Sequence, residues 1–181
     1  LARQFSNQYD IKDINTLSPI AATRKAYKLC GKDPNRYRPS QEQMMRRILK
    51  GLGLYNVNTL VDMGNLISLK TGCSIGCFDA DKIEGDTLCL GIGKEDEPYK
   101  GIGRGPLNIS GLPVFRDKIG GIGTPTSDNE RTKLSLDTVN LLCTVHLFDP
   151  EIDIEEVKRL FENYLKKYAE SSAIKTSVFI P

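Results

Sequence analysis

Apolar residues in the first part of the chain recur every three or four positions, the spacing of a helix with one buried side. This pattern predicts three helices, over residues 18–30, 40–50 and 58–71. Each is followed by a glycine, which is favoured just beyond a helix end because it adopts a left-handed backbone. These glycines are Gly31, Gly51 and Gly72.

The starts of the first two helices also carry signals. Ser18 precedes Pro19 and is predicted to cap the first helix. Ser40 lies three residues before Gln43, the spacing of a capping box. Gly64 falls in the middle of the third helix, where glycine costs about 1 kcal/mol relative to alanine. This cost predicts that another backbone or a ligand approaches Gly64 closely.

Beyond Gly72 the helical spacing gives way to short β-type runs. Ten of the sixteen glycines lie between Gly85 and Gly123, which is typical of hairpins. The predicted strands cover residues 87–90, 112–116 and 118–122, and a long apolar run, 139–148, is predicted to be a central strand. An amphipathic segment predicts a last helix at about 153–170. Helices, then strands, then a helix indicate one α+β domain over residues 1–181, with antiparallel or mixed sheets and flanking helices.

Composition and charge narrow the class of protein. Hydrophobic residues make up 39% and charged residues 27%, as in ordinary globular domains, and the net charge of +2 does not by itself require a nucleic acid. Nine basic residues lie between Arg24 and Lys50, however, against Asp33 and Glu42 alone. They form either two solvated helix faces or a surface for an anionic partner.

No membrane segment is expected, and no signal peptide is visible in the sequence. No apolar stretch approaches the roughly 20 residues that span a bilayer. The chain begins with Leu1 instead of methionine, so we expect residues to be missing from its front. The five cysteines are an odd number without a CxxC pair, which predicts reduced thiols and a cytoplasmic location.

The sequence offers few residues that could bind a metal or a cofactor or form a nucleophilic catalytic site. Cys73 and Cys77 are the one close cysteine pair, and no second pair or nearby histidine completes a zinc site. We therefore expect neither a metal nor a cofactor. His146, the only histidine, lies in an apolar run and is expected to be a satisfied core or surface residue, which argues against Ser-His-Asp and Cys-His catalysis.

One loop, residues 120–133, combines flexible backbone with polar side chains. Its glycines are followed by three hydroxyl groups, an acid and two bases, so the loop could present donors to an anion or a polarised carbonyl. The alternative is a structural turn in which Ser127 or Asp128 caps a short helix. The sequence leaves both interpretations open.

Two segments of the chain resemble a known family. The first comprises Val61-Asp62-Met63-Gly64-Asn65, then Gly72, then Ile75-Gly76-Cys77-Phe78-Asp79-Ala80-Asp81-Lys82. It is similar to the B3/B4 domain of the bacterial phenylalanyl-tRNA synthetase beta subunit, which shows Val-Asp-x-Thr-Asn, a helix ending in glycine, and Pro-Leu-His-Ala-Phe-Asp-Ala-Asp-Lys. The second, Ile119–Gly123 with Ser127, resembles that family's glycine loop. The resemblance covers about residues 39–138, and the chain as a whole resembles the stand-alone B3/B4 proteins.

In the synthetase this domain hydrolyses tyrosine that is wrongly esterified to the phenylalanine tRNA. The resemblance therefore implies a pocket for the aminoacyl end of a tRNA. The family's threonine, histidine and glutamate, however, fall on Gly64, Gly76 and Pro125. We accordingly expect a reshaped pocket that favours a different amino acid, or a binding site without chemistry.

Two hypotheses follow. In the first, the domain binds an aminoacyl-tRNA and acts as a deacylase in trans; in the second, it is a non-catalytic module for a free amino acid, a small metabolite or a synthetase chain. Because ester hydrolysis needs a placed water and a stabilised carbonyl oxygen, we expect Asp79 or Asp128 as the catalytic residue that places water, with amides near Gly121–Thr124 holding the carbonyl oxygen. The expected substrate-binding residues are Asp62, Asn65, Phe78, Gly120, Gly121, Gly123, Thr124, Thr126 and Ser127. The expected RNA-binding residues are Arg38, Arg104, Arg116 and Arg131.

Overall fold

The structure is a computed structural model that describes residue 5 and residues 7–179. The first four residues of the predicted domain, including Leu1, and its last two lie outside the described part. The helices are α2 (Ser18–Leu29), α3 (Ser40–Leu49), α4 (Thr59–Thr71) and α5 (Ile154–Tyr168). The strands are β1 (Ser74–Asp79), β2 (Cys89–Ile92), β3 (Lys100–Gly101), β4 (Gly105–Pro106), β5 (Pro113–Arg116), β6 (Gly121–Gly123) and β7 (Leu141–His146). Short 3₁₀ turns are η1 (Ile14–Thr16), η2 (Ala80–Lys82) and η3 (Glu130–Thr132).

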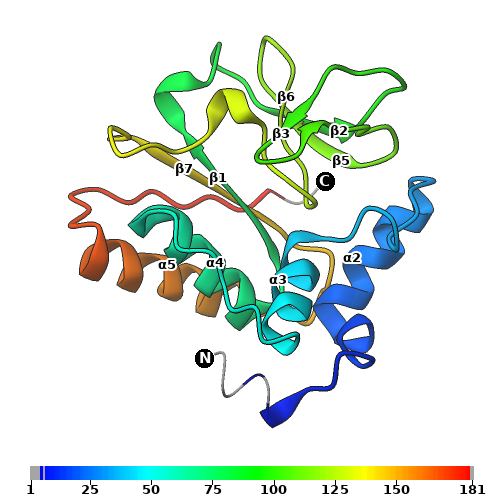
Figure 1. The fold of residues 1–181 in the computed structure, drawn as a ribbon. Helices are drawn as coiled ribbons and strands as arrows, with labels where there is room; N and C mark the ends of the chain where they lie inside the picture. Colours follow the sequence, from blue (N-terminus) through cyan, green and yellow to red (C-terminus); the bar gives the residue numbers. More distant parts are fainter. Residues whose placement is uncertain (1–4, 6, 180–181) are drawn as a thin grey trace.

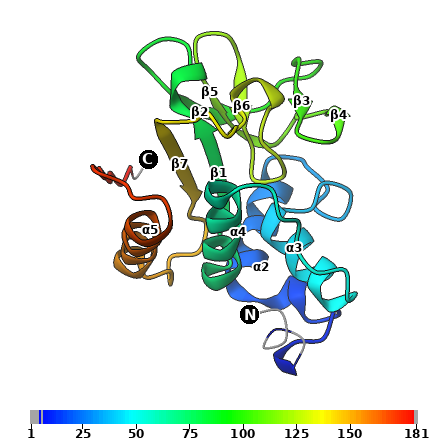
Figure 2. The same ribbon diagram turned by 60° about the vertical axis from the view of Figure 1, so that its left-hand side comes forward.

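The predicted α+β class is confirmed. A long antiparallel ribbon of β1 and β7 runs through the middle of the molecule, with α4 and α5 along one side of it (Figure 1). The remaining strands gather near the end of this ribbon, in a three-stranded sheet β2-β5-β6 and a small hairpin β3-β4. Figure 2 shows α3 and α2 on the other side of α4 from α5.

The ends of the helices agree with the sequence, but two of their starts do not. Leu17 and Pro39 are the residues before α2 and α3, and neither helix has a side-chain cap. The Ser40 N–H instead donates to the Pro125 carbonyl at 2.8 Å, and the Gln43 side chain donates to the Arg38 carbonyl at 2.6 Å. The predicted capping box is therefore wrong, because tertiary partners take both groups.

The predicted start and end of α4 are confirmed. The Asn58 side chain accepts a hydrogen bond from the Val61 N–H at 2.9 Å, and Gly72 ends the helix with φ 71°. A Cβ on Gly64 would lie 2.7 Å from the Cys77 Sγ. The close neighbour at Gly64 is thus a thiol of β1 and not the expected backbone or ligand, and it lets α4 pack directly on the strand.

The long apolar run before α5 forms β7, but this strand is not central. It pairs with β1 alone, with Cys77 opposite Cys143 and Gly76 opposite Thr144. The apolar character of the run has another cause: side chains of β1 and β7 pack with α4 and α5 in one hydrophobic cluster around Ile67 and Phe161. Helices therefore cover β7 where further strands were expected.

Two other clusters hold the remaining elements together. One joins α2, α3 and α4 around Ile20, Met45 and Leu69. The other joins α2 to the small strands, where Tyr27 packs with Tyr99, Leu112 and neighbouring residues. None of the helices among residues 5 and 7–179 is long and apolar enough to cross a membrane.

Candidate functional site

Asp128 lies where the loop after β6 meets the middle of β1. Its Oδ2 accepts a hydrogen bond from the Cys77 backbone N–H at 3.1 Å. Burial raises the pKa of the Asp128 carboxyl from 3.8 to about 7, because the charged form loses its water and the Cys77 N–H offsets only part of this cost. A carboxyl with this pKa exchanges a proton readily at neutral pH, which suits a general acid or base.

Asp79, the other predicted catalytic carboxylate, is surrounded by partners. The Lys82 Nζ lies 3.0 Å from its Oδ2, the Thr138 hydroxyl donates to Oδ2 at 2.9 Å, and the Asp81 N–H donates to Oδ1 at 3.2 Å. These contacts, led by Lys82, lower the pKa of Asp79. Asp79 is therefore ionised and fully engaged in holding the turn after β1, whereas Asp128 keeps acceptor capacity.

The hydroxyl groups of the loop after β6 are directed inward. The Thr124 hydroxyl donates to the Ser127 carbonyl at 3.0 Å and accepts the N–H groups of Thr126 and Ser127. The Thr126 hydroxyl lies 2.9 Å from the Tyr27 hydroxyl of α2. Both threonines are buried and fix the loop, while Ser127 is half-buried next to Asp128.

The backbone amides of this loop are also largely engaged. The Thr124 N–H donates to the Ser127 carbonyl at 3.2 Å, and the Gly120 N–H donates to Asp117 Oδ1 at 3.1 Å. Within the predicted oxyanion segment, Gly121–Thr124, the Thr124 amide is thus already engaged, as is that of Gly120 directly before it. Gly120 itself has open space at its Cβ position, with nothing within 4 Å.

The ring of Phe78 fills the space above two glycines. Phe78 is fully buried, and a Cβ on Gly76 would lie 2.6 Å from its Cζ and 2.9 Å from the Thr144 Oγ1. A Cβ on Gly123 would collide with the same ring. The position at which relatives are expected to carry histidine is therefore closed to any side chain here.

Asp62 and Asn65 lie one turn apart at the start of α4. The Asp62 Oδ1 accepts the Val57 N–H at 3.0 Å, so this carboxylate holds the segment that leads into the helix. Both residues are half-buried. Gly64, which lies between them in the sequence, packs against Cys77, the residue that donates to Asp128.

Cys77 adds a backbone donor but not a nucleophile. Its Sγ lies 3.6 Å from the Cys143 Sγ on the neighbouring strand. This thiol neighbour and burial raise the pKa of Cys77 well above its usual value. The thiolate, which is the reactive form, is therefore disfavoured at neutral pH.

The four predicted RNA-binding arginines fall into two groups. Arg116 pairs with Glu97 through two hydrogen bonds of 2.6 Å, and Arg131 pairs with Asp117 at 2.8 Å. Both of these side chains are mostly covered.

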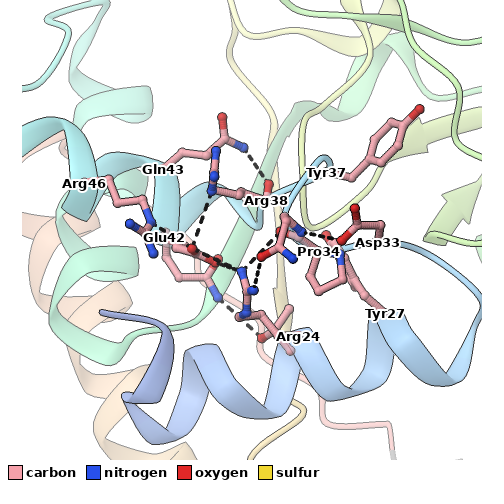
Figure 3. Close-up of polar contacts among 12 residues, drawn as sticks. Arg24, Tyr27, Asp33, Pro34, Tyr37, Arg38, Glu42, Gln43 and Arg46 are labelled. Atoms are coloured by element: carbon pink, nitrogen blue, oxygen red, sulfur yellow. Dashed lines mark hydrogen bonds and ion pairs between the residues drawn. The ribbon is translucent and has the colours of Figure 1, made fainter. Parts of the chain in front are cut away.

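Arg38 and Arg104, in contrast, are exposed and converge on one residue of α3. The Gln43 amide nitrogen donates to the Arg38 carbonyl at 2.6 Å, and the Arg104 guanidinium donates to the Gln43 Oε1 (Figure 3 shows Arg38 and Gln43). The Arg104 Cβ and the Ser127 Oγ both lie close to Gly101, and the Ile102 N–H donates to the Asp128 carbonyl at 3.0 Å. The exposed Arg104 thus belongs to a hairpin that contacts the loop of Asp128. Arg38 instead meets Gln43 through its backbone carbonyl, and its Nε lies 3.7 Å from the Glu42 carboxylate.

A buried carboxylate explains part of the basic segment between Arg24 and Lys50. Glu42 is fully buried, and its carboxylate lies 2.9 Å from Arg24, 2.8 Å from Arg46 and 3.7 Å from Arg38 (Figure 3). For Arg24 and Arg46 the interpretation as freely solvated helix faces is wrong, because their charges meet the buried Glu42, whereas Arg38 remains exposed. Lys25, Lys28, Arg36 and Lys50 are exposed.

Sequence reasoning missed Gln43 as the residue that brings Arg38 and Arg104 together, and Tyr27 as the partner of Thr126. Residues 27 and 126 are 99 positions apart, so no local spacing could have indicated the contact. A hollow of about 220 Å³ lies at the end of α5, lined by residues 162–174, and includes none of the predicted site residues. Within residues 5 and 7–179, no group of three or more His, Cys, Asp or Glu side chains could hold a metal ion.

His146 lies in the core and not at the surface. Its ring centroid lies 5.1 Å from that of Phe115 and 6.1 Å from that of Phe148. This burial lowers the pKa of His146 from 6.5 to about 4, so the imidazole is neutral at physiological pH.

Comparison with known proteins gives the family. The family model of the B3/4 domain matches residues 22–169. Residues of this chain are 41% identical over 68 positions to the phenylalanine–tRNA ligase beta subunit of Bartonella quintana, and 37% identical over 67 positions to that of Bartonella henselae. The aligned segments cover 38% and 37% of this chain but only 8% of each relative. The chain therefore belongs to the B3/4 domain family.

Proposed function

We propose that this domain binds the aminoacyl end of a tRNA beside Asp128 and hydrolyses a mischarged aminoacyl ester in trans. The observation that carries the proposal is the half-buried Asp128 carboxyl with its pKa near 7, in a loop that contacts the hairpin of the exposed Arg104. Family membership and the likeness to phenylalanine–tRNA ligase beta subunits support the choice of substrate.

The proposed step needs only groups of this chain and the substrate. The ionised Asp128 carboxylate accepts a proton from a water molecule as its oxygen adds to the ester carbonyl. The ester bond to the ribose then breaks, and the proton passes to the departing ribose oxygen. The products are a free amino acid and a tRNA, while Arg38 and Arg104 hold nearby phosphates.

The changes at Gly64, Gly76 and Pro125 affect which amino acid would fit. The Phe78 ring and Thr144 occupy the space at Gly76, so a recognition side chain of the kind expected in relatives has no room. We therefore propose a substrate other than tyrosine. This function places the domain in the cytoplasm, where it would work alongside synthetase chains.

A deacylation assay with a panel of mischarged tRNAs tests the proposal. We expect Asp128→Asn to slow hydrolysis of the preferred substrate by about a hundredfold or more, a typical loss for a general base. Asp137→Asn, at an exposed carboxylate, serves as the matched control and should leave the rate unchanged. Wild-type turnover by a folded Asp128→Asn variant would refute the assignment of Asp128.

A non-catalytic module is the second candidate, and the closed position at Gly76 favours it. It predicts that no ester in the panel is hydrolysed faster than in buffer. It also predicts that calorimetry detects a free amino acid or a synthetase chain bound to the wild-type domain. Binding of either partner without hydrolysis of any ester would show that the domain is a recognition module and would refute the deacylase proposal.

A further inference from the structure

The solvent-facing side of α3 forms a basic strip that ends in an exposed aromatic ring. Gln43, Arg47 and Lys50 are spaced by three or four residues and share one face of the helix, opposite the buried Met45 and Ile48. We name this surface the α3 strip, and its residues are Arg38, Gln43, Arg47, Lys50, Tyr55 and Arg104.

The aromatic end of the α3 strip has an unusual arrangement. The Arg47 guanidinium carbon lies 3.9 Å from the centre of the Tyr55 ring, while Tyr55 remains 64% exposed. A cation against one face of a tyrosine holds the ring in place and leaves much of it open to solvent. Such a ring is a ready platform for stacking a nucleic-acid base.

Within the part of the chain that the structure describes, Arg38 is the one cation of the α3 strip with an acidic partner, the Glu42 carboxylate at 3.7 Å. Among the described residues, neither Arg47, Lys50 nor Arg104 forms a salt bridge, and the Arg47 Nε is buried without a hydrogen-bond partner. Their neighbour Arg46 differs, because its charge is taken by Glu42 at 2.8 Å. The positive charge of the strip is therefore available to an anionic polymer.

The dimensions of the strip match a short single strand. Gln43 and Lys50 are seven residues apart, or about 10 Å along the helix. This length corresponds to roughly three nucleotides at the ~3.4 Å rise of a stacked strand. Arg104 extends the strip at the Gln43 end toward Asp128, and Tyr55 extends it at the Lys50 end.

From this geometry we propose that the α3 strip binds single-stranded nucleic acid, with Arg47, Lys50 and Arg104 on phosphates and Tyr55 stacked on a base. The inference rests on the proposed function for its direction, since the strand would lead to Asp128. It assigns a second, separate binding element to a surface that begins beside the catalytic carboxylate.

Fluorescence anisotropy with an unstructured single-stranded RNA oligonucleotide tests the strip, using the whole chain. Tyr55→Ala should weaken binding about tenfold without changing its salt dependence, because stacking releases no counterions. Tyr55→Phe should bind like the wild type, since the ring and not the hydroxyl is required. Arg47→Ala and Lys50→Ala should each weaken binding and reduce the slope of log K against log salt by about 0.7.

Tyr168→Ala is the matched control. Tyr168 is 51% exposed and lies beside Lys167, with the ammonium 5.0 Å from its ring, but it is on α5. Equal binding by Tyr55→Ala, Tyr168→Ala and wild-type protein would overturn the inference, as would binding of an acidic peptide in place of RNA.

The outcome separates this inference from the proposed function. If Tyr55→Ala leaves RNA binding intact while Asp128→Asn abolishes deacylation, the strip is wrong and the deacylase stands. If Tyr55→Ala weakens RNA binding while no mischarged tRNA is hydrolysed, the strip stands and the deacylase is wrong.

Discussion

The Asp128 carboxylate accepts the backbone N–H of Cys77 at 3.1 Å, which joins the loop after β6 to the centre of β1. Cys77 lies between Gly76, which is closed by Phe78, and Phe78 itself. Asp128 is thus held by β1, the strand on which relatives are expected to carry a histidine at the position of Gly76. Its protonation should be visible in the stability of the whole chain.

The stability of the protein should carry two opposing pH dependences. Between pH 3.8 and about 7 the folded Asp128 holds a proton that the unfolded chain has lost, so its contribution to stability falls as pH rises. His146 takes up a proton below pH 6.5 in the unfolded chain but only below about pH 4 in the folded chain. The contribution of His146 to stability therefore falls as pH decreases. In the wild type the two effects offset each other.

Single variants should uncover each dependence. Asp128→Asn should show a free energy of unfolding that falls as pH decreases from 6.5 to about 4, because the opposing effect of Asp128 is gone. His146→Gln should show the reverse trend, a gain in stability on acidification. Urea unfolding at several pH values measures both, and identical profiles for all three proteins would contradict the assigned burial of these groups.

Replacing Glu42 should strongly destabilise the packing of α2 against α3. Glu42→Gln removes the negative charge that Arg24 and Arg46 share, and losing one partner of a buried ion cluster costs about 3–5 kcal/mol. The control Glu155→Gln breaks an exposed pair with Lys158 and should change the free energy of unfolding by less than about 1 kcal/mol. Comparable losses in urea unfolding would argue against a buried cluster.

Gly64 and Cys77 should be energetically coupled. Gly64→Ala raises helix propensity by about 1 kcal/mol but drives a Cβ to within 2.7 Å of the Cys77 Sγ, so we expect net destabilisation. In a Cys77→Ala background the same change should be neutral or stabilising. A double-mutant cycle of unfolding free energies measures the coupling. An equal cost of Gly64→Ala in both backgrounds would rule out the thiol as the cause.

The two groups of arginines should respond differently to removal. Arg104→Ala should weaken tRNA binding and lower its salt slope by about 0.7 to 0.9, because one exposed cation is lost. Arg131→Ala should leave the slope unchanged and cost about 2 kcal/mol of stability, because buried Asp117 loses its charged donor. Filter binding at two salt concentrations and urea unfolding distinguish them, and the reverse pattern would contradict this grouping.

Local features of the sequence predicted the frame of the molecule well. The glycine stops and the Asn58 start of α4 depend on residues near one another in the chain. The cost of glycine at position 64 indicated a close contact, but the neighbour is a side chain and not the predicted backbone or ligand. The capping box at Ser40 failed because Pro125, far along the chain, competes for the same N–H.

The candidate site was harder to predict, because its properties arise from distant contacts. The spacing of Glu42 and Arg46 already suggests an ion pair, but the contact of Glu42 with Arg24 exists only once α2 and α3 pack together. Likewise, Asp128 and Asp79 are equivalent as sequence letters. Only the fold separates their pKa values: burial raises the pKa of Asp128, which has no cation beside it in the described part of the chain, whereas Lys82 lowers the pKa of Asp79.

The pairing of β1 with β7 has a consequence for how the fold diversifies. Asp79 ends one strand directly opposite Leu141, which begins the other, so the chain leaves and re-enters the ribbon at the same place. The whole segment between Asp79 and Leu141, including the loop of Asp128 and the hairpin of Arg104, is therefore one insertion whose two ends lie side by side. Such a segment can be exchanged as a cassette between relatives, so specificity can be transplanted while the ribbon and its helices stay untouched.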